Sequence, residues 1–131
     1  MSESSAVNQS LERVRRALAA VVPPPREKLA GNDRAAAVLV PIFERDGTLH
    51  VVYIRRSDQV ASHRGQVAFP GGRVDPADQT VLDTALREAH EEVGIPPDAV
   101  EVLGALPTAT TYTSGILVSP FAGLIPDSTP L

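Results

Sequence analysis

The amino-acid sequence predicts an α+β domain built on a mixed β-sheet. Two β-rich runs flank an Asp46-Gly47 turn signal in the first half of the chain. A helical pattern follows at residues 80–93, and two further β-rich runs come after that helix. Strands, one central helix and more strands differ from the regular alternation of a doubly wound parallel sheet. The order of the elements therefore indicates an α+β architecture.

The first 32 residues are expected to form a short helix and a proline-rich linker. Apolar residues recur at helical spacing from Leu11 to Val21, Ser10 is the expected N-cap, and the prolines at 23–25 end the helix. We therefore divide the chain into this N-terminal segment, 1–32, and one folded domain, 33–131.

The strands of the folded domain follow from its apolar runs. AAAVLVPIF at 35–43 and LHVVYIRR at 49–56 are expected to pair as a hairpin through the Asp-Gly turn. AVEVLGALPTAT at 99–110 and GILVSPFAGLI at 115–125 supply two more strands. The segment between the hairpin and the helix is polar and irregular, and we expect a loop there.

The predicted helix packs through an apolar stripe and stops at a glycine. We expect Leu82, Leu86, Ala89 and Val93 to form the buried stripe. Gly94 is the expected left-handed C-terminal stop, and prolines follow two and three residues later.

The end of this helix, LREAHEEVGI, gathers three glutamates on one face. With Glu88 as the reference direction, Glu91 lies about 60° to one side and Glu92 about 40° to the other. Like charges at i and i+4 cost helix stability, and the last turn faces the negative end of the helix dipole. Because stability alone would not select this pattern, we interpret the acidic face as a ligand site.

The composition excludes several classes of function. Without cysteine there is no disulfide, thiolate metal site or cysteine nucleophile. The net charge of −4 argues against general nucleic-acid binding, and no apolar run is long enough to span a membrane. The acidic, polar N-terminus does not resemble an export signal, so we expect a cytoplasmic protein. Three clustered carboxylates in such a chain suit a hard divalent cation, Mg²⁺ or Mn²⁺.

The segment 87–95, REAHEEVGI, resembles the second half of the Nudix box at every defined position. The strict upstream spacing would put Gln79 where the box has a glutamate and Arg73 where it has a glycine. One additional loop residue restores Gly72 as the glycine of the box. The chain is thus similar to the Nudix hydrolase family, with a longer loop.

That longer loop resembles the coenzyme A pyrophosphatase branch of the family. The segments GQVAFPGG and Arg56-Ser57 match the motif of this branch in sequence and in spacing. The resemblance covers about residues 33–131. One arginine of the branch falls on Ala61 here, although His63 and Arg64 lie nearby. The chain also ends directly after its last predicted strand, so we expect a shortened family member without a C-terminal helix.

The resemblance implies an α/β/α sandwich that hydrolyses a nucleoside diphosphate linked to another group. For the branch, the substrate is coenzyme A or acyl-CoA, which is split into 3′,5′-ADP and (acyl-)4′-phosphopantetheine. Mg²⁺ or Mn²⁺ would neutralise charge on the diphosphate and activate water. By position, Glu88 and Glu92 would be direct metal ligands, and Glu91 a further ligand or the base. Arg87 would orient Glu88.

The resemblance also implies substrate contacts. Gly71 and Gly72 would let the loop approach the diphosphate, and Arg55, Arg56 and Arg64 would bind the anionic substrate. These arginines have an equally good explanation as solvated surface residues.

Several alternatives stay open at this point. Arg87 pairs with Asp83 or Glu91 at i±4, or it orients a glutamate. Asp78 replaces the missing acid of the box or caps the helix, and capping is favoured. We expect His90 at the surface and Phe69 in the core.

The function also has alternatives. ADP-ribose or a dinucleotide is the second choice of substrate. A Nudix-like module that binds a nucleotide or a protein without turnover is the alternative to an enzyme. Assembly as a homodimer is left open.

Overall fold

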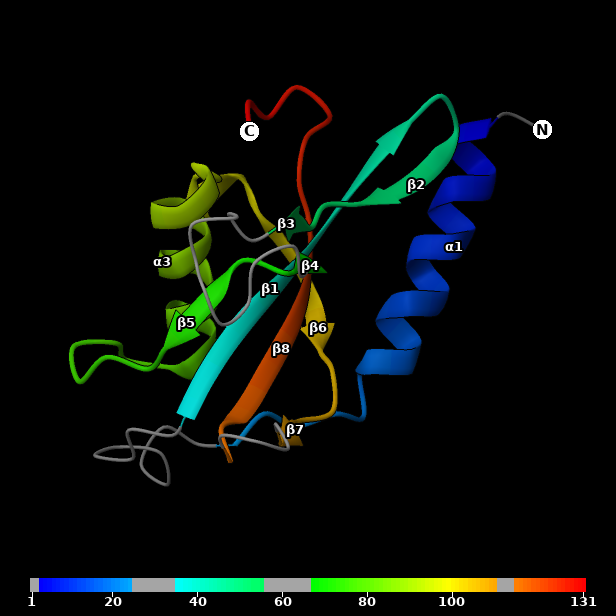
Figure 1. Cartoon of the computed structure of the whole chain (residues 1–131). Coiled ribbons are helices and arrows are strands. Elements are labelled where there is room, and N and C mark those ends of the chain that lie inside the picture. The colour runs from blue at the N-terminus through cyan, green and yellow to red at the C-terminus, as the bar shows by residue number, and fades with distance from the viewer. Residues whose placement is uncertain (1–2, 25–34, 56–66, 111–114) are drawn as a thin grey trace.

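The computed structural model describes residues 3–24, 35–55, 67–110 and 115–131 (Figure 1). The elements in chain order are α1 (Glu3–Leu18), β1 (Ala35–Arg45), β2 (Thr48–Val51), β3 (Ile54–Arg55), β4 (Val67–Ala68), β5 (Gly71–Arg73), α3 (Val81–Val93), the 3-10 helix η1 (Pro97–Ala99), β6 (Glu101–Ala105), β7 (Ala109–Thr110) and β8 (Leu117–Leu124). No helix in these described parts of the chain is both long and apolar enough to cross a membrane.

The strands confirm the mixed sheet that the sequence predicts. The main sheet has the order β2-β1-β8-β6, with β5 added to β1 and β7 added to β8. β1 and β8 run parallel in the register Ala35↔Leu117 to Ile42↔Leu124, whereas the other described pairings are antiparallel. The long β1 therefore joins the last strand to the rest of the domain.

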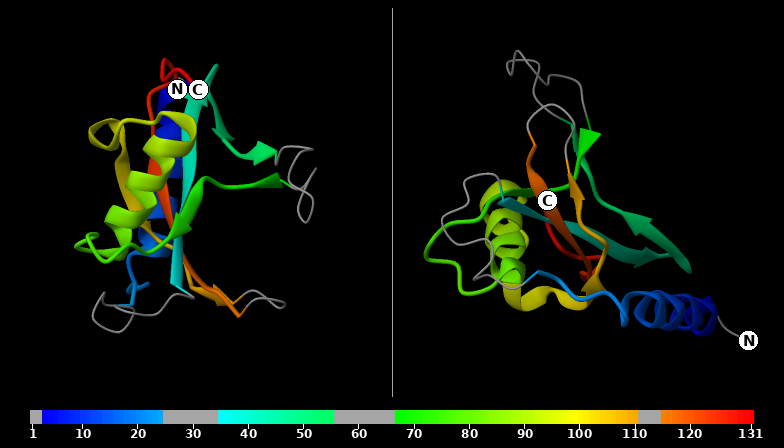
Figure 2. Two further views of the ribbon diagram at one scale, coloured as in Figure 1. Left: turned by 60° about the vertical axis from the view of Figure 1, so that its left-hand side comes forward. Right: turned by 90° about the horizontal axis from the view of Figure 1, so that it is seen from below.

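The core lies between this sheet and α3. Alternate residues of β1, Ala35, Ala37 and Leu39, are buried, as period-two strand geometry requires. They pack in one cluster with Val81, Ala85 and Ala89 of α3 and with Phe121 of β8. The left view of Figure 2 shows α3 in front of β1 and β8, with α1 behind them. The chain thus forms an α+β sandwich.

The N-terminal helix starts earlier than the sequence predicts. α1 begins at Glu3, so Ser10 lies inside the helix and is not its N-cap. Val7 is buried, and it extends the apolar stripe by one turn ahead of Leu11. The helix also ends earlier, at Leu18, and a turn then leads toward the prolines.

The Asp46-Gly47 hairpin is confirmed. Asp46 and Gly47 have φ values of 53° and 74°, which is the left-handed pair that a tight hairpin turn uses. The second β-rich run does not stay in one sheet, however. β2 ends at Val51, and β3 pairs with β4 in a separate two-stranded ribbon. The expected loop at 57–67 lies outside the described residues except for Val67.

Both ends of α3 follow their sequence signals, but its buried stripe is rotated. Thr80 caps the helix in a capping box with Asp83, and Gly94 ends it at φ 78°. The fully buried helix residues are Val81, Thr84, Ala85 and Ala89. The predicted leucines 82 and 86 and Val93 are only partly buried at the flanks. Small residues at the centre of the contact let the helix lie close to the sheet, so the stripe prediction was right only for Ala89.

Candidate active site

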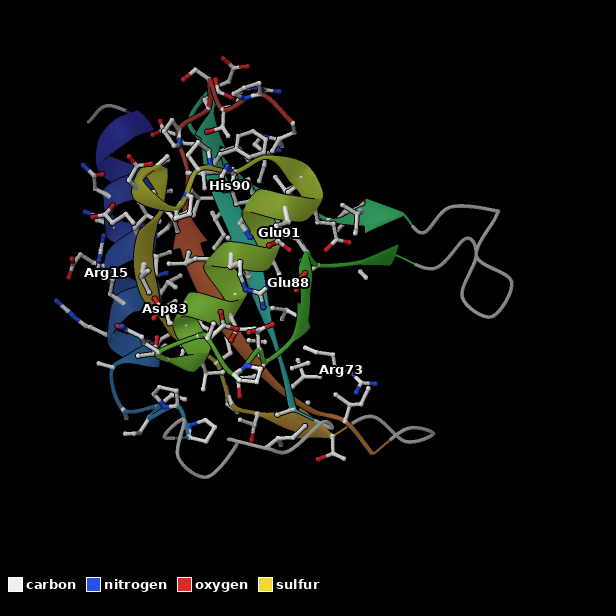
Figure 3. The ribbon with its side chains drawn as sticks, turned by 90° about the vertical axis from the view of Figure 1, so that its left-hand side faces the viewer. Arg15, Arg73, Asp83, Glu88, His90 and Glu91 are labelled. Atoms are coloured by element: carbon white, nitrogen blue, oxygen red, sulfur yellow. The ribbon has the colours of Figure 1, made fainter. Side chains whose placement is uncertain are left out.

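The acidic face of α3 meets the two glycines of the FPGG segment. The Gly71 N–H donates to Glu92 Oε2 at 3.2 Å. A Cβ atom added to Gly72 would lie 2.5 Å from Glu88 Cδ, so the carboxylate occupies the space that any side chain would need. Figure 3 shows Glu88 and Glu91 on the side of α3 that faces β5. The structure therefore brings together two segments that the sequence singled out separately.

Arg87 joins this face to the loop that precedes the helix. Its Nη1 donates to Glu88 Oε1 at 2.9 Å and to Glu91 Oε2 at 3.3 Å. Its Nε and Nη2 donate to the two oxygens of Asp78 at 2.9 and 3.0 Å, and Nη2 also donates to the Arg73 carbonyl oxygen at 3.2 Å. Both the bond to Glu91 and the bond to Glu88 that the sequence left as alternatives are present. Asp83 instead belongs to the helix cap.

Asp78 is the anchor of this network, and the favoured interpretation of it as a helix cap was wrong. Its side chain is 6% exposed in the pair with Arg87, and Oδ2 also accepts from Thr84 Oγ1 at 2.7 Å and from the Asp75 N–H at 2.9 Å. Thr80 performs the capping. The sequence did indicate an alternative role for Asp78. When Gly72 is taken as the glycine of the box, Asp78 falls where the box has its first glutamate.

The electrostatics of this pair favour the charged form of both groups. Burial alone would raise the pKa of Asp78, but hydrogen bonds from Arg87, the Asp75 N–H and Thr84 lower it from 3.8 to about 2. Hydrogen bonding to Asp78 raises the pKa of Arg87 in turn. Arg87 is therefore a permanent cation, fixed on its buried side and offering Nη1 to Glu88 and Glu91.

The three carboxylates of the acidic face differ in how exposed their side chains are and in how tightly they are held. The Glu88 side chain is 22% exposed and held between Arg87 and Gly72, whereas that of Glu91 is 60% exposed. Glu92 is also exposed. The face thus combines one fixed carboxylate with two adjustable ones.

A divalent cation fits the chemistry of this face. Within the described residues, no group of three His, Cys, Asp or Glu side chains is already positioned to hold a metal ion. The donors are nevertheless carboxylate oxygens, which hard cations such as Mg²⁺ prefer. The close approach of Glu88 to Gly72 also brings one of these donors against the backbone of β5. The structure presents a suitable donor set rather than a finished cage.

Only some of the remaining candidate residues lie in the described part of the chain. Arg55 lies in β3, where its backbone pairs with Val67, but Arg56, Ala61 and Arg64 lie outside the described residues. His90 and Gln79 are exposed, which confirms His90 as a surface residue. Phe69 is 38% exposed and lines a cavity, so its assignment to the core was wrong.

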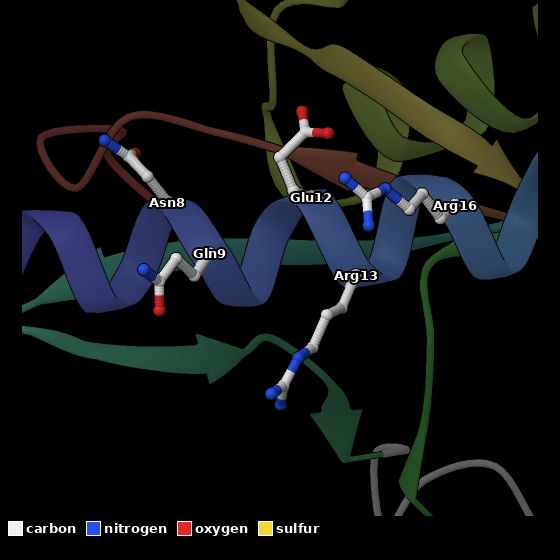
Figure 4. A pocket seen from close by; sticks show the side chains of 5 residues that line it. All are labelled: Asn8, Gln9, Glu12, Arg13 and Arg16. Atoms are coloured by element: carbon white, nitrogen blue, oxygen red, sulfur yellow. The ribbon is translucent and has the colours of Figure 1, made fainter.

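Cavities in the described part of the chain lie on different surfaces. One of about 440 Å³ runs along α1, and Figure 4 shows that its lining side chains, Asn8, Gln9, Glu12, Arg13 and Arg16, all come from that helix. Another, of about 450 Å³, lies against Gly71 and Gly72. The second cavity therefore shares its wall with the carboxylates, whereas the first belongs to a different surface.

The family follows from comparison with known domains. The model of the NUDIX domain matches residues 33–117, a span that includes Gly72, Asp78 and all of α3. The chain belongs to the Nudix family. The fixed and adjustable glutamates of α3 and the buried Asp78 all lie within the matched domain.

Curated Nudix relatives are identical to this chain at about half of the aligned positions. The protein named uncharacterized Nudix hydrolase NudL in Photorhabdus laumondii is 49% identical over 105 residues, covering 80% of this chain and 55% of its own length. The protein of the same name in Yersinia enterocolitica is 51% identical over 100 residues, covering 76% of this chain and 50% of its own. This Nudix chain therefore spans about half the length of these relatives.

A solved structure supports the Nudix fold. The Ap4A hydrolase of C. elegans superposes with a TM-score of 0.61 at 21% identity, over 72% of this chain and 69% of that one. At this identity the likeness concerns the fold alone.

Proposed function

We propose that this Nudix domain hydrolyses the diphosphate bond of coenzyme A or an acyl-CoA. The products would be 3′,5′-ADP and (acyl-)4′-phosphopantetheine. The observation that carries the proposal is the closure of the acidic face of α3 on Gly71 and Gly72, with Glu88 held by Arg87. Such an arrangement of one fixed carboxylate and two more exposed ones beside a glycine backbone suits a diphosphate and its counter-ion.

Each residue of the face has a role in this proposal. Glu88 and Glu92 are the ligands of Mg²⁺ or Mn²⁺, and Glu91 is a further ligand or the base that takes the proton of the attacking water. Arg87 is a positioning residue, since its bonds to Asp78 hold it while Nη1 fixes Glu88. When bound, the divalent cation would supply charge neutralisation on the diphosphate. Water adds to one phosphorus atom, the bridging P–O bond breaks, and the departing phosphate keeps the bridging oxygen.

The sequence around the glycines supports coenzyme A as the substrate. GQVAFPGG and the longer loop resemble the coenzyme A pyrophosphatase branch. Phe69, Gly71 and Gly72 of that motif line the cavity, and the two glycines also contact the carboxylates. Arg55, Arg56 and Arg64 are proposed contacts for the phosphates of coenzyme A. The proposal also includes a cytoplasmic location, with assembly as a homodimer left open.

A substrate panel tests this proposal. Purified protein would be incubated with coenzyme A, ADP-ribose, NADH or Ap4A in the presence of Mn²⁺, with product analysis by chromatography. We expect 3′,5′-ADP and 4′-phosphopantetheine in equal amounts from coenzyme A, at a kcat/KM above that for the other three. Faster cleavage of ADP-ribose or a dinucleotide would shift the proposal to that diphosphate.

A nucleotide-binding module without turnover is the second candidate. It is favoured by Gln79 at the strict acidic position and by the lack of a finished metal cage among the described side chains. Calorimetry that detects nucleotide binding without Mg²⁺, together with no hydrolysis in its presence, would support this candidate over the enzyme.

A further inference from the structure

The cavity beside Gly71 and Gly72 is lined mainly by apolar groups, which have no role in the chemistry proposed for the acidic face. Its volume is about 450 Å³, within the range of small-molecule sites. Its described walls are mainly apolar and come from three segments of the chain: Ala36 and Val38 of β1, Ala68 and Phe69 around β4, and Ile116 and Val118 at the start of β8.

The cavity lies on the face of β1 that points away from α3. Ala35, Ala37 and Leu39 face the core, so the alternate residues Ala36 and Val38 face the cavity. Val118 is the register partner of Ala36 on β8 and continues the same wall. The aromatic ring of Phe69 is partly exposed beside them. Burial of an apolar substrate group would explain why this side chain is not packed in the core.

Gly71 and Gly72 connect the cavity to the carboxylates. Both glycines line the cavity, while Gly71 donates to Glu92 and Gly72 lies against Glu88. The two sites are therefore separated by the thickness of one strand. A diphosphate bound at Glu88 and Glu92 would therefore have this cavity within reach of one of its two adjoining groups.

Coenzyme A offers two such groups. On one side is adenosine, and on the other is the pantoyl group, whose two geminal methyl groups are one methylene away from the phosphate ester. Among the described lining residues, Arg73 has the only side chain that forms hydrogen bonds, and it can only donate. Adenine carries hydrogen-bonding atoms around its edge, including an amino group that needs an acceptor. The dimethyl carbon of the pantoyl group needs only apolar contact, and the hydroxyl and carbonyl of that group lie on the next two carbons. The side chains of the cavity thus match the dimethyl end of the pantoyl group better.

We propose that this cavity binds the pantoyl end of the phosphopantetheine half of the substrate, with Ala36, Ala68 and Val118 as specificity-determining residues. The inference rests on the proposed function and deepens it. ADP-ribose and NADH share the adenosine diphosphate of coenzyme A but lack the pantoyl group. The cavity therefore supplies a physical reason for this domain to prefer coenzyme A.

Two cavity-filling variants test the assignment. Ala36→Leu and Ala68→Leu each add apolar volume to a different wall, and Ala99→Leu on η1 makes the same change outside the cavity lining. Calorimetry on the full chain would measure the affinities of 4′-phosphopantetheine and of 3′,5′-ADP separately. Unfolding midpoints of all three variants would verify that they are folded, and having two filling variants allows for the loss of one.

We expect the filling variants to weaken 4′-phosphopantetheine about tenfold, as loss of the contacts of two methyl groups predicts. The affinity for 3′,5′-ADP should stay within about twofold, and Ala99→Leu should change neither affinity. Weakened binding of 3′,5′-ADP with intact binding of 4′-phosphopantetheine would overturn the assignment in favour of adenosine. Equal weakening of both ligands, no weakening of either, or no binding of 4′-phosphopantetheine by the unaltered chain would also overturn it.

The proposed function can fail separately. Turnover of coenzyme A by the unaltered chain would be measured on the same preparation. Absence of turnover, with cavity-dependent binding of 4′-phosphopantetheine retained, would contradict the hydrolase and leave the cavity assignment standing.

Discussion

Helices α1 and α3 each carry an arginine that pairs with a carboxylate outside its own helix, yet the two arginines make different contacts. In α1, Arg15 pairs with Glu101 at 2.7 Å, and the two side chains are 35% and 58% exposed. In α3, Arg87 binds Asp78, whose side chain is 6% exposed, and extends the contact to Glu88 and Glu91. A cluster of charges is therefore not enough to mark a site. The buried anchor beneath α3 is what fixes one carboxylate toward Gly72.

The largest expected effect is a loss of turnover on changing α3, which a change in α1 should not cause. Glu92→Gln should lower turnover of coenzyme A about 100-fold or more, because it removes a carboxylate from the acidic face. Arg16→Gln in the α1 cavity is the control and should leave turnover within about twofold. Steady-state kinetics with Mn²⁺ provides the measurement, with unfolding midpoints as the test of folding. Unchanged turnover in Glu92→Gln would rule out the proposed role of this face.

Removing the anchor should have the next largest effect. Asp78→Asn keeps the size of the side chain but loses the charge that holds Arg87, so Glu88 loses its fixed position. Turnover should fall about 10- to 100-fold, as for other residues that orient ligands. The free energy of unfolding, from urea titration, should fall by about 2 kcal/mol. Loss of stability with unchanged kcat would mean that Asp78 supports the fold alone.

The same variant predicts a dependence on pH. The pKa of Asp78 is lowered in the folded protein, from 3.8 to about 2, so its contribution to stability is present above pH 3.8 and is lost as the pH falls through about 2. The difference in unfolding free energy between the unaltered chain and Asp78→Asn should therefore shrink across this window. Urea titrations at several acidic pH values would measure it. A difference that stays constant or grows on acidification would contradict the charge of Asp78 as the cause.

Two glycines sharpen the comparison further, because each lies against a helix side chain. A Cβ on Gly72 would lie 2.5 Å from Glu88 Cδ, and one on Gly104 would lie 2.6 Å from Leu18 Cβ of α1. Gly72→Ala should displace Glu88 and lower turnover about tenfold, since a shift of a positioned group is costly for the reaction. Gly104→Ala should destabilise the fold while leaving kcat of the folded fraction unchanged. Equal kcat values for the two variants would contradict this distinction.

The smallest expected effect belongs to the ion pair of α1. Arg15→Gln should change the free energy of unfolding by about 1 kcal/mol or less, because exposed pairs gain little over their solvated charges. The change should also shrink at high salt. Thermal unfolding at low and high ionic strength would measure both quantities. A loss of unfolding free energy as large as that of Asp78→Asn would show that burial does not explain why the two ion pairs differ in strength.

Local signals in the sequence were enough for much of the fold. Asp46-Gly47 requires two left-handed residues, and the hairpin forms there. Gly94 likewise marks the end of α3. Helical spacing predicted one face for the three glutamates, and they contact Gly72, Arg87 and Gly71 on the side of α3 near β5. These predictions succeeded because neighbouring residues in the chain determine the conformation.

The errors concern contacts between distant segments. Ser10 has the chemistry of an N-cap, but Val7 finds a buried position that extends α1 past it. Asp78 has the chemistry of a cap too, and only the folded loop brings it to Arg87. Phe69 is apolar enough for a core, yet its position beside β4 opens onto a cavity. Sequence patterns name the chemistry of such residues, whereas tertiary packing selects the partner.

Binding of Mn²⁺ is the most direct test of the central claim that the acidic face of α3 is a divalent-cation site. Electron paramagnetic resonance would measure free Mn²⁺ during titration of the unaltered chain, Glu88→Gln and Arg16→Gln. We predict saturable binding that weakens about tenfold or more in Glu88→Gln and is unchanged in Arg16→Gln. Equal binding by Glu88→Gln and the unaltered chain, or no saturable binding by either, would contradict the claim.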